Sequence, residues 1–351
     1  MKKILTINPG STSTKIGLFR NRELIWEKSI PFPPDAIHSD NVAREFEMRY
    51  KQLMEVLNPQ DLENLSAAVG RGGPLKPMEG GVYAINEKML DDLRHARYGN
   101  HASNLGAMLA DAIAKTRNLP AFIIDPVTVD EFEPISYISG VPAIRRKSRS
   151  HALNIKAMVR RCCDEQKWTI TETNFVVAHL GGGISIAAVK KGRIADVNDG
   201  LLGMGPFSPE RAGALPLAGL IELAFSGEYS KAELEQLFSK NSGLKAYLGT
   251  NDARKIEQRI ANGDEKAKLI YDAMIYQIRK EIGAMLAACD FSPKAILLTG
   301  GLTHSEYIQS ALKKHIPNFK IFFYPGENEL IAMADGAFRV LSGQTELKHY
   351  E

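Results

Sequence analysis

Residues 2–19 read KKILTINPGSTSTKIGLF, and this stretch decides the fold. An apolar segment runs into the polar turn NPGSTSTK at residues 8–15, and a second segment with alternating apolar residues follows it. The pattern predicts two strands joined by a tight turn. The turn combines an amide, a glycine, hydroxyls and a lysine, so it can direct N–H groups and one cation toward an anion such as a phosphate. An ordinary polar hairpin remains the alternative, since the Gly-Lys-Ser/Thr order of a P-loop is absent.

Residues 174–189, NFVVAHLGGGISIAAV, repeat this plan of apolar strand, glycine-rich turn and apolar strand. In both places a short charged turn and a further strand follow, at residues 24–30 and 194–197. A unit that occurs twice, about half a chain apart, indicates an internal duplication. We therefore predict an α/β protein of two lobes, each with a mixed sheet, which face each other across a cleft and hold a nucleotide between their turns.

The composition limits the classes of protein that the chain can belong to. Its 351 residues are 44% hydrophobic and 24% charged, with a net charge of +3, which is typical of a globular protein of two domains. The charges are interspersed, so we expect no nucleic-acid surface. No apolar run is long enough to span a bilayer, and the early first strand leaves no signal peptide. The three cysteines lack CxxC spacing, which favours a reduced, cytoplasmic setting over a zinc site or disulfides.

Charged side chains follow two predicted strands of the first half. Arg71 comes between glycines after the buried segment 65–70, and Asp125 follows a second such segment. Ligands of α/β sheets bind at the carboxyl ends of strands. Arg71 could therefore make a two-pronged contact with a carboxylate or phosphate, although a solvated arginine is the alternative. Asp125 could hold a magnesium ion or position a reactant, with Asp130 and Glu131 as nearby competitors or helix-start acids.

Three further features of the second half suggest ligand contacts. His151 lies at the predicted N-terminus of a helix, and the N-terminus is the end of a helix where anions bind. Arg211 lies in the long glycine- and proline-rich loop at residues 199–213, and loops of this length inside compact domains are usually functional. Gly300 and Gly301 follow a strand, where the missing side chains would let an adenine or ribose lie against the backbone.

The expected division into lobes follows from these elements. The basic run near residues 144–150 is interpreted mainly as a solvated linker. The first lobe would comprise residues 1–147, with a C-terminal helix at residues 329–351 returning to it, and residues 148–328 would form the nucleotide-binding second lobe.

The combination of motifs resembles the acetate/butyrate kinase (acetokinase) family of the actin-like ATPase superfold, essentially from end to end. The motifs that carry the resemblance are NPGSTSTK at 8–15, Arg71, the Ser-His pair at 150–151, HLGGGIS at 179–185 and LTGGL at 298–302. Within the family, GRGGPLKPMEGGVYAIN at 70–86 and PGENEL at 325–330 are similar to butyrate kinases rather than to acetate kinases, which are also usually longer.

The resemblance implies reversible transfer of the γ-phosphoryl group of ATP to a short-chain carboxylate, giving an acyl phosphate and ADP. Butyrate or isobutyrate is the acid that the butyrate branch implies, with acetate or propionate as the alternative. A kinase of the sugar or glycerol type, with Asp125 as base toward a hydroxyl, is a more distant alternative, because a neutral sugar offers no carboxylate to Arg71 and Arg211. Family habit also implies a homodimer or a larger homo-oligomer.

The resemblance also implies a role for each candidate residue. Arg71, Arg211 and His151 would hold the carboxylate and the phosphoryl oxygens, with no general base, because a carboxylate is ionised at neutral pH. Mg²⁺ would be coordinated through Asn8, Asp125 and Glu329, although a strict overlay places Asn328 at the family's glutamate. The residues expected to bind the nucleotide are Asn8, Ser11, Ser13, Lys15, His179, Gly181, Gly182, Gly183, Gly300 and Gly301.

Overall fold

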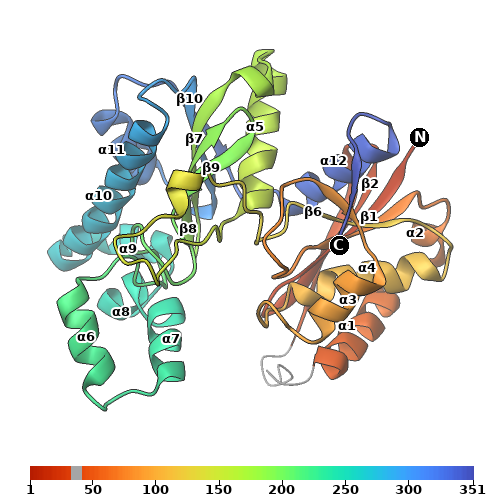
Figure 1. The fold of residues 1–351 in the computed structure, drawn as a ribbon, viewed down its shortest axis with the longest axis horizontal. Coiled ribbons are helices and arrows are strands. Elements are labelled where there is room, and N and C mark those ends of the chain that lie inside the picture. Colours follow the sequence, from red (N-terminus) through yellow and green to blue (C-terminus); the bar gives the residue numbers. More distant parts are fainter. Residues whose placement is uncertain (33–41) are drawn as a thin grey trace. The chain divides into compact units, whose positions relative to one another are not determined.

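The computed structural model describes residues 1–32 and 42–351, which form two compact units (Figure 1). One unit comprises residues 1–129 together with 328–351, and the other comprises residues 130–327. Each unit contains one mixed sheet with helices. The predicted α/β class with two mixed sheets is therefore confirmed.

The first unit is built on a seven-stranded sheet with the order β12-β5-β6-β4-β1-β2-β3. Strands β1, β2 and β3 form an antiparallel meander, whereas β4 and β6 run parallel to β1 on its other side. The strands are β1 Lys3–Pro9, β2 Ser13–Arg20, β3 Glu23–Pro31, β4 Ala67–Arg71, β5 Val82–Ala84, β6 Ala121–Ile124 and β12 Leu347–His349.

Helices cover both faces of this sheet. One apolar cluster includes Ile16 and Leu18 of β2 together with residues of α3 and α4. Gly17 alternates with them and faces the other side, where a Cβ would lie 3.3 Å from Leu330 of α12. Helix α12 therefore packs on the opposite face, against β1 and β4. The helices are α1 Val42–Val56, α2 Pro59–Leu62, α3 Glu87–Arg94, α4 Asn104–Lys115 and α12 Glu329–Leu341.

The second unit repeats the central part of the first. Its five-stranded sheet has the order β11-β10-β7-β8-β9. Strand β7 pairs with antiparallel β8 on one side and with parallel β10 on the other, as β1 does with β2 and β4. This common topology is the structural form of the predicted duplication. The strands are β7 Asn174–Leu180, β8 Ile184–Lys190, β9 Arg193–Val197, β10 Ala295–Gly300 and β11 Ile321–Pro325.

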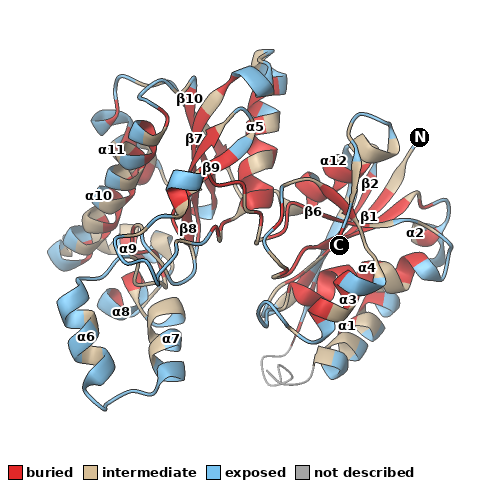
Figure 2. Cartoon of the chain, in the orientation of Figure 1, coloured by how far each residue is buried: buried red, intermediate tan, exposed pale blue. Residues whose placement is uncertain are grey.

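Two long helices pack on the second sheet, and a helical subregion extends from it. Helix α5 contacts β7 and β10, and α10 contacts β7 and β8. Figure 2 shows buried residues concentrated on these strands, whereas α6 has no buried residue. The helices are α5 Ala152–Gln166, α6 Leu217–Phe225, α7 Lys231–Lys240, α8 Gly243–Leu248, α9 Ala253–Ala261, α10 Glu265–Ala288 and α11 Glu306–His315.

The division into units falls earlier than the boundary expected at 147/148. Residues 130–147 belong to the second unit because their side chains are fixed there. Glu131 accepts the N–H of Ile194 at 2.7 Å and pairs with Lys156 at 2.7 Å. Arg146 reaches both carboxylate oxygens of Asp196. These partners are distant in sequence, so a composition-based boundary could not locate them.

Candidate active site

Three predicted residues of the first unit lie at or just after the carboxyl ends of three neighbouring parallel strands. In the register, Ile7 lies beside Gly70, and Arg71 lies beside Ile124. Asn8 near the end of β1, Arg71 at the end of β4 and Asp125 after β6 are therefore placed along one edge of the sheet. Parallel strands bring their carboxyl ends to a common edge, which is where α/β sheets bind ligands.

Glu329 lies at the centre of the polar contacts on this edge. Its Oε2 accepts a hydrogen bond from Asn8 Nδ2 at 2.5 Å, and its Oε1 lies 3.2 Å from Arg71 Nη2. The arginine side chain is 6% exposed and that of Glu329 is 15% exposed. Asn328, the alternative from the family overlay, takes a left-handed conformation at φ 47° and caps α12. Glu329 is thus the acid that the structure brings to Asn8 and Arg71.

Arg71 retains one unpaired donor. Among the residues that the structure describes, no hydrogen-bond partner contacts its buried Nη1 atom. Leaving a buried donor unpaired costs about 1–3 kcal/mol, and such groups in native proteins usually have a functional explanation. Because Glu329 compensates only part of the guanidinium, Arg71 can still donate to an oxygen of a bound anion.

Asp125 is fully buried and holds a neighbouring loop. Its Oδ1 accepts the N–H of Gly81 at 2.8 Å, and its own N–H donates to Gly81 O at 3.0 Å. The residue has φ 40°, a left-handed conformation that aspartate tolerates better than most residues. The two competitors, Asp130 and Glu131, lie in the other unit, where Asp130 accepts from the Tyr137 hydroxyl at 2.7 Å. Burial, and next the hydrogen bond to Asp130, raise the pKa of Tyr137 to about 12.

The residues of the first unit fit a magnesium ion held jointly with phosphates. Among the described residues, no cluster of three or more His, Cys, Asp or Glu side chains is suited to a metal ion. Mg²⁺ in phosphoryl-transfer sites usually takes only one or two carboxylates and completes its shell with water and phosphate oxygens. Glu329 with Asn8 has this character, whereas the carboxylate of Asp125 is occupied by Gly81.

The β1–β2 turn lies beside this edge. Ser11 and Lys15 are exposed and Ser13 is half-buried. The turn is closed by Gly10 N–H, which donates to Ser13 O at 2.7 Å. Asn8 and Lys15 are cross-strand partners in the β1–β2 ladder, so their side chains share one face of the sheet. The turn thus presents side chains where an anion could contact them.

In the second unit, two predicted histidines stack on each other. The rings of His151, at the start of α5, and His179, in β7, have centroids 3.9 Å apart and an interplanar angle of 12°. His151 Nδ1 lies 2.9 Å from Ser185 Oγ. Asn154 donates through Nδ2 to Glu327 O at 2.5 Å, so its Oδ1 atom is the one that lies 3.0 Å from His179 Nδ1. Because an amide oxygen can only accept, His179 Nδ1 carries the proton of this hydrogen bond.

Arg211 packs against the predicted glycine turn, Gly181 to Gly183. Its Nη1 donates to Gly200 O, and a Cβ at residue 183 would collide with its guanidinium. Within the described chain, the buried Nε atom of Arg211 has no hydrogen-bond partner. Burial lowers the pKa of Arg211, against the opposing effect of the Glu210 and Asp199 carboxylates, but an arginine stays charged under all ordinary conditions.

Gly300 and Gly301 differ in what surrounds them. A Cβ at Gly300, which has φ 91°, would collide with the backbone of Leu180. A Cβ at Gly301 would meet nothing within 4 Å, so the backbone here is open to a flat group, as the predicted nucleotide contact requires.

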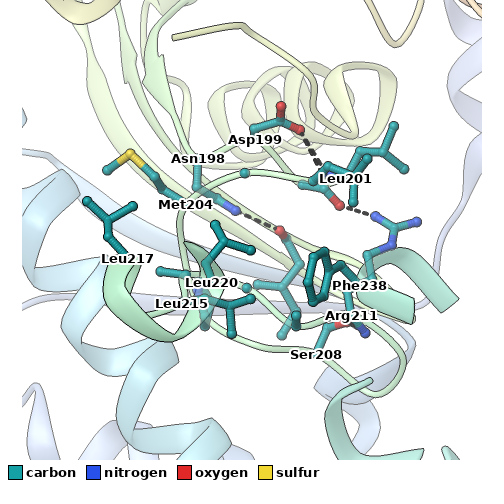
Figure 3. A pocket seen from close by; sticks show the side chains of 18 of the residues that line it. Asn198, Asp199, Leu201, Met204, Ser208, Arg211, Leu215, Leu217, Leu220 and Phe238 are labelled. Atoms are coloured by element: carbon teal, nitrogen blue, oxygen red, sulfur yellow. Dashed lines mark hydrogen bonds between the residues drawn. The ribbon is translucent and has the colours of Figure 1, made fainter. Parts of the chain in front are cut away.

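A cavity of about 380 Å³ lies beside Arg211 (Figure 3). The loop around residues 198–215 and helix α6 supply most of its wall, and the figure shows Met204, Leu215, Leu217 and Phe238 around it. A mostly apolar cavity with a charged group at its side is the usual form of a small-molecule site. The hydrophobic residues in that glycine-rich loop are the sequence signal for it.

Two residues that support these contacts were not predicted from the sequence. Asn154 orients His179, and Arg49 of α1 binds the back of the β1–β2 turn. Their positions on helices carry no motif, and only the tertiary structure reveals their partners. Ser185, which contacts His151, lies in the predicted HLGGGIS motif.

The two sheets share a duplicated topology of antiparallel and parallel strands, and the predicted residues lie at strand ends and glycine turns of that topology. The sequence profile of the Acetokinase family matches residues 144–337, more than half of the chain. The protein therefore belongs to the acetokinase family, whose members are phosphotransferases with a carboxyl group as acceptor. The matched segment contains His151, His179 and Arg211 but not Asn8, Arg71 or Asp125.

Solved structures show the same fold over almost the whole chain. Acetate kinase from Porphyromonas gingivalis is 20% identical, with a TM-score of 0.76 over 97% of this chain and 100% of that one. Propionate kinase from Francisella tularensis subsp. tularensis SCHU S4 is 20% identical, with a TM-score of 0.76 over 95% and 99%. Acetate kinase from Entamoeba histolytica is 15% identical, with a TM-score of 0.77 over 95% and 98%.

No helix within the described residues is both long and apolar enough to cross a membrane.

Proposed function

We propose that the protein transfers the γ-phosphoryl group of ATP reversibly to a short-chain aliphatic carboxylate, giving an acyl phosphate and ADP. The observation that supports this most is that Arg71 and Arg211 are both predicted site residues and that each keeps a buried nitrogen with no hydrogen-bond partner among the residues that the structure describes. A hydrogen bond between a charged donor and an anion contributes about 1.5–3 kcal/mol. A carboxylate and a phosphoryl group supply the anionic oxygens that these two donors lack.

In the proposed reaction a carboxylate oxygen forms a bond to the γ-phosphorus, and the bond from that phosphorus to the β–γ bridging oxygen breaks. The carboxylate is already ionised near pH 7, so no residue has to remove a proton. Arg71 and Arg211 bind the carboxylate and the transferring oxygens, and His151 donates an additional hydrogen bond. Such fixed donors stabilise charge most effectively in a site that excludes water.

The remaining predicted residues position the nucleotide in this proposal. Glu329 and Asn8 hold Mg²⁺, which neutralises charge on the phosphates when it is bound. Asp125 acts through the Gly81 loop that it fixes, because its buried carboxylate already accepts a hydrogen bond. The residues proposed to contact ATP are Ser11, Ser13, Lys15, His179, Gly181, Gly182, Gly183, Gly300 and Gly301.

Acetate or propionate is the acid that the comparisons favour, because the three solved structures named above, with TM-scores of 0.76 and 0.77, are acetate and propionate kinases. Butyrate is the second candidate. It is favoured by the segments at 70–86 and 325–330, and by the largely apolar cavity of about 380 Å³ beside Arg211. A kinase of the sugar or glycerol type is less well supported, since Asp125, its only proposed base, is fully buried against Gly81.

The test is a hydroxylamine-trapping assay with MgATP and straight-chain acids from acetate to hexanoate, with glycerol and glucose as controls. We expect acyl hydroxamate from acids of two to four carbons and no ADP release with the two alcohols. Preference for acetate or propionate would support the family reading, and a maximum at four carbons would support the butyrate branch. Phosphorylation of an alcohol without any acyl phosphate would overturn the proposal.

We further propose that the chain forms a homodimer or a larger homo-oligomer. Leu217, Ile221 and Phe225 of α6 are 73%, 57% and 86% exposed, and apolar patches of this kind often mark protein interfaces. Sedimentation equilibrium tests this, and a purely monomeric protein at micromolar concentration would contradict it. A reduced, cytoplasmic location also stays a proposal, in keeping with the three buried free cysteines.

A further inference from the structure

Arg49 is a fully buried cation to which none of the roles above is assigned. It lies in the middle of α1, and its side chain is 0% exposed. We propose that Arg49 is a positioning residue for phosphoryl transfer, which acts through the β1–β2 turn without touching the substrate. The inference rests on the proposed function to the extent that this turn binds the phosphates of ATP.

The guanidinium of Arg49 binds three acceptors of the turn. Nη1 donates to Thr14 Oγ1 at 2.7 Å and to Ser13 O at 3.4 Å, and Nη2 donates to Gly10 O at 2.8 Å. These acceptors lie on both sides of Ser11 and Thr12, the exposed tip of the turn. A planar guanidinium has its donors in a fixed fork, so one side chain sets the distance between the two ends of the turn.

These hydrogen bonds also set the direction of an N–H group. A trans peptide is planar, and its N–H points opposite to its C=O. Because the carbonyl of Gly10 points at Arg49, the N–H of Ser11 in the same peptide points away from it. An anion on that side of the turn would therefore meet the Ser11 N–H already oriented, together with the exposed Ser11 hydroxyl. Orientation fixed before binding lowers the cost of binding and of reaction.

The surroundings of Arg49 indicate that its role is geometric rather than long-range attraction. Glu45, one helical turn earlier, lies 2.8 Å from Nη2 and accepts from Nε at 2.9 Å. The ring of Phe32 stacks 3.9 Å from the guanidinium carbon. The carboxylate pairs with the positive charge, and the ring restricts the plane of the guanidinium. Removal of Arg49 should therefore displace the turn more than it changes the local potential.

The test compares Arg49→Met, Arg49→Lys and Thr14→Val with Lys51→Met, which removes an exposed cation from the same helix. For each, we would measure the thermal unfolding temperature, the Kd of MgATP by calorimetry without acceptor acid, and the KM values of MgATP and of the acid separately. Thr14→Val keeps the shape of the side chain and removes one acceptor, so it tests the contact even where Arg49→Met folds poorly.

We expect kcat/KM for MgATP to fall about 10²-fold in Arg49→Met, the size of effect that misplacement by about 1 Å can cause. Arg49→Lys should recover part of this loss, and Thr14→Val should show a smaller loss of the same kind. The KM of the acid should change less than twofold, and Lys51→Met should match the wild type. A structural role alone would lower activity only in proportion to the folded fraction, with no selective effect on MgATP, and would overturn the inference.

The two proposals can fail separately. A wild-type protein that makes no acyl phosphate, yet binds MgATP in a manner that depends on Arg49, would refute the carboxylate kinase and keep the positioning role. A wild-type protein that makes acyl phosphate, with folded Arg49→Lys and Thr14→Val variants that bind MgATP as tightly as the wild type, would refute the positioning role alone.

Discussion

The β1–β2 turn and the β7–β8 turn have the same plan, and an arginine from outside each hairpin packs against each of them. Every nitrogen of Arg49 has an acceptor, namely Glu45, Thr14 or a turn carbonyl. Arg211 also donates to a carbonyl, but its buried Nε has no partner among the described residues. The same residue type beside two similar turns therefore serves two purposes. Arg49, whose nitrogens all have acceptors, fixes backbone, and Arg211 retains one donor for a ligand.

The largest expected effects on kcat and on stability come from replacing Arg211 and Arg49, respectively, with apolar side chains. Arg211→Ala should lower kcat about 10²–10³-fold, as loss of a preorganised donor does elsewhere. It removes the hydrogen bond to Gly200 O, so it should lower the free energy of unfolding by about 0.5–1.5 kcal/mol. Arg49→Met should cost about 1–3 kcal/mol of stability, since it leaves buried acceptors unpaired.

Steady-state kinetics and urea unfolding measure the two effects. Arg254→Ala is the control, because the Arg254 side chain is 90% exposed. A catalytic loss in Arg211→Ala that merely follows its loss of stability would remove the distinction between the two arginines.

A smaller effect is expected from Gly183→Ala. The added Cβ would collide with the Arg211 guanidinium and displace it from the turn. We expect a fall in kcat on the order of tenfold to 10²-fold, within the range known for misplaced catalytic groups, with the fold retained. Gly283→Ala is the matched control, because a Cβ there meets nothing within 4 Å. Equal kcat values for the two variants would show that the position of Arg211 is not critical.

The support of His179 should have a still smaller effect. Asn154→Leu removes the acceptor of the His179 Nδ1–H and the donor to Glu327 O. Loss of a residue that orients a functional histidine typically costs about tenfold or more in activity. The KM of MgATP should rise, since the ring is then no longer held in its orientation. The exposed Asp164→Ala on the same helix is the control, and an unaltered KM of MgATP in Asn154→Leu would contradict the orienting role.

The smallest effect concerns a partly buried acid outside both turns, Glu281. Burial, and next the Asp196 carboxylate, raise the pKa of Glu281. A carboxyl whose pKa is higher in the folded state contributes full stability below its unfolded pKa and loses it as the pH rises through the folded value. Glu281→Gln removes the ionisable group, so it should raise the unfolding temperature more at pH 8, where the wild-type carboxyl is charged, than at pH 5. At pH 8 we expect a rise of a few degrees, which corresponds to about 1 kcal/mol. The exposed Glu222→Gln is the charge control; a larger gain at pH 5 would refute this.

Local pattern predicted the parts of the site that depend on backbone periodicity. Alternation and glycine predicted the two strand–turn–strand units, and apolar runs placed Arg71 and Asp125 after predicted strands. The structure adds the parallel pairing of β1, β4 and β6, which brings these positions and Asn8 to one edge of one sheet. The contacts of Glu329 depend on where α12 packs, which the overlay of motifs could not decide.

Features that depend on tertiary contacts could not be predicted from the sequence. Arg49 lies in an amphipathic helix, where a charged residue ordinarily faces solvent, and its burial depends on a turn far away in sequence. Conversely, the apolar sequence of α6 suggests a packing element, yet no residue of that helix is buried. Residues 130–147 joined the second unit through long-range ion pairs that composition does not reveal.

The central claim is best tested by ³¹P NMR of the wild-type protein with MgATP and either acetate, propionate or butyrate. For at least one of the three acids, we predict an acyl-phosphate resonance that grows in equal amount with ADP. The rate of its growth should be greatly lowered in both Arg71→Ala and Arg211→Ala. Release of inorganic phosphate without acyl phosphate, or unaltered rates in both variants, would contradict it.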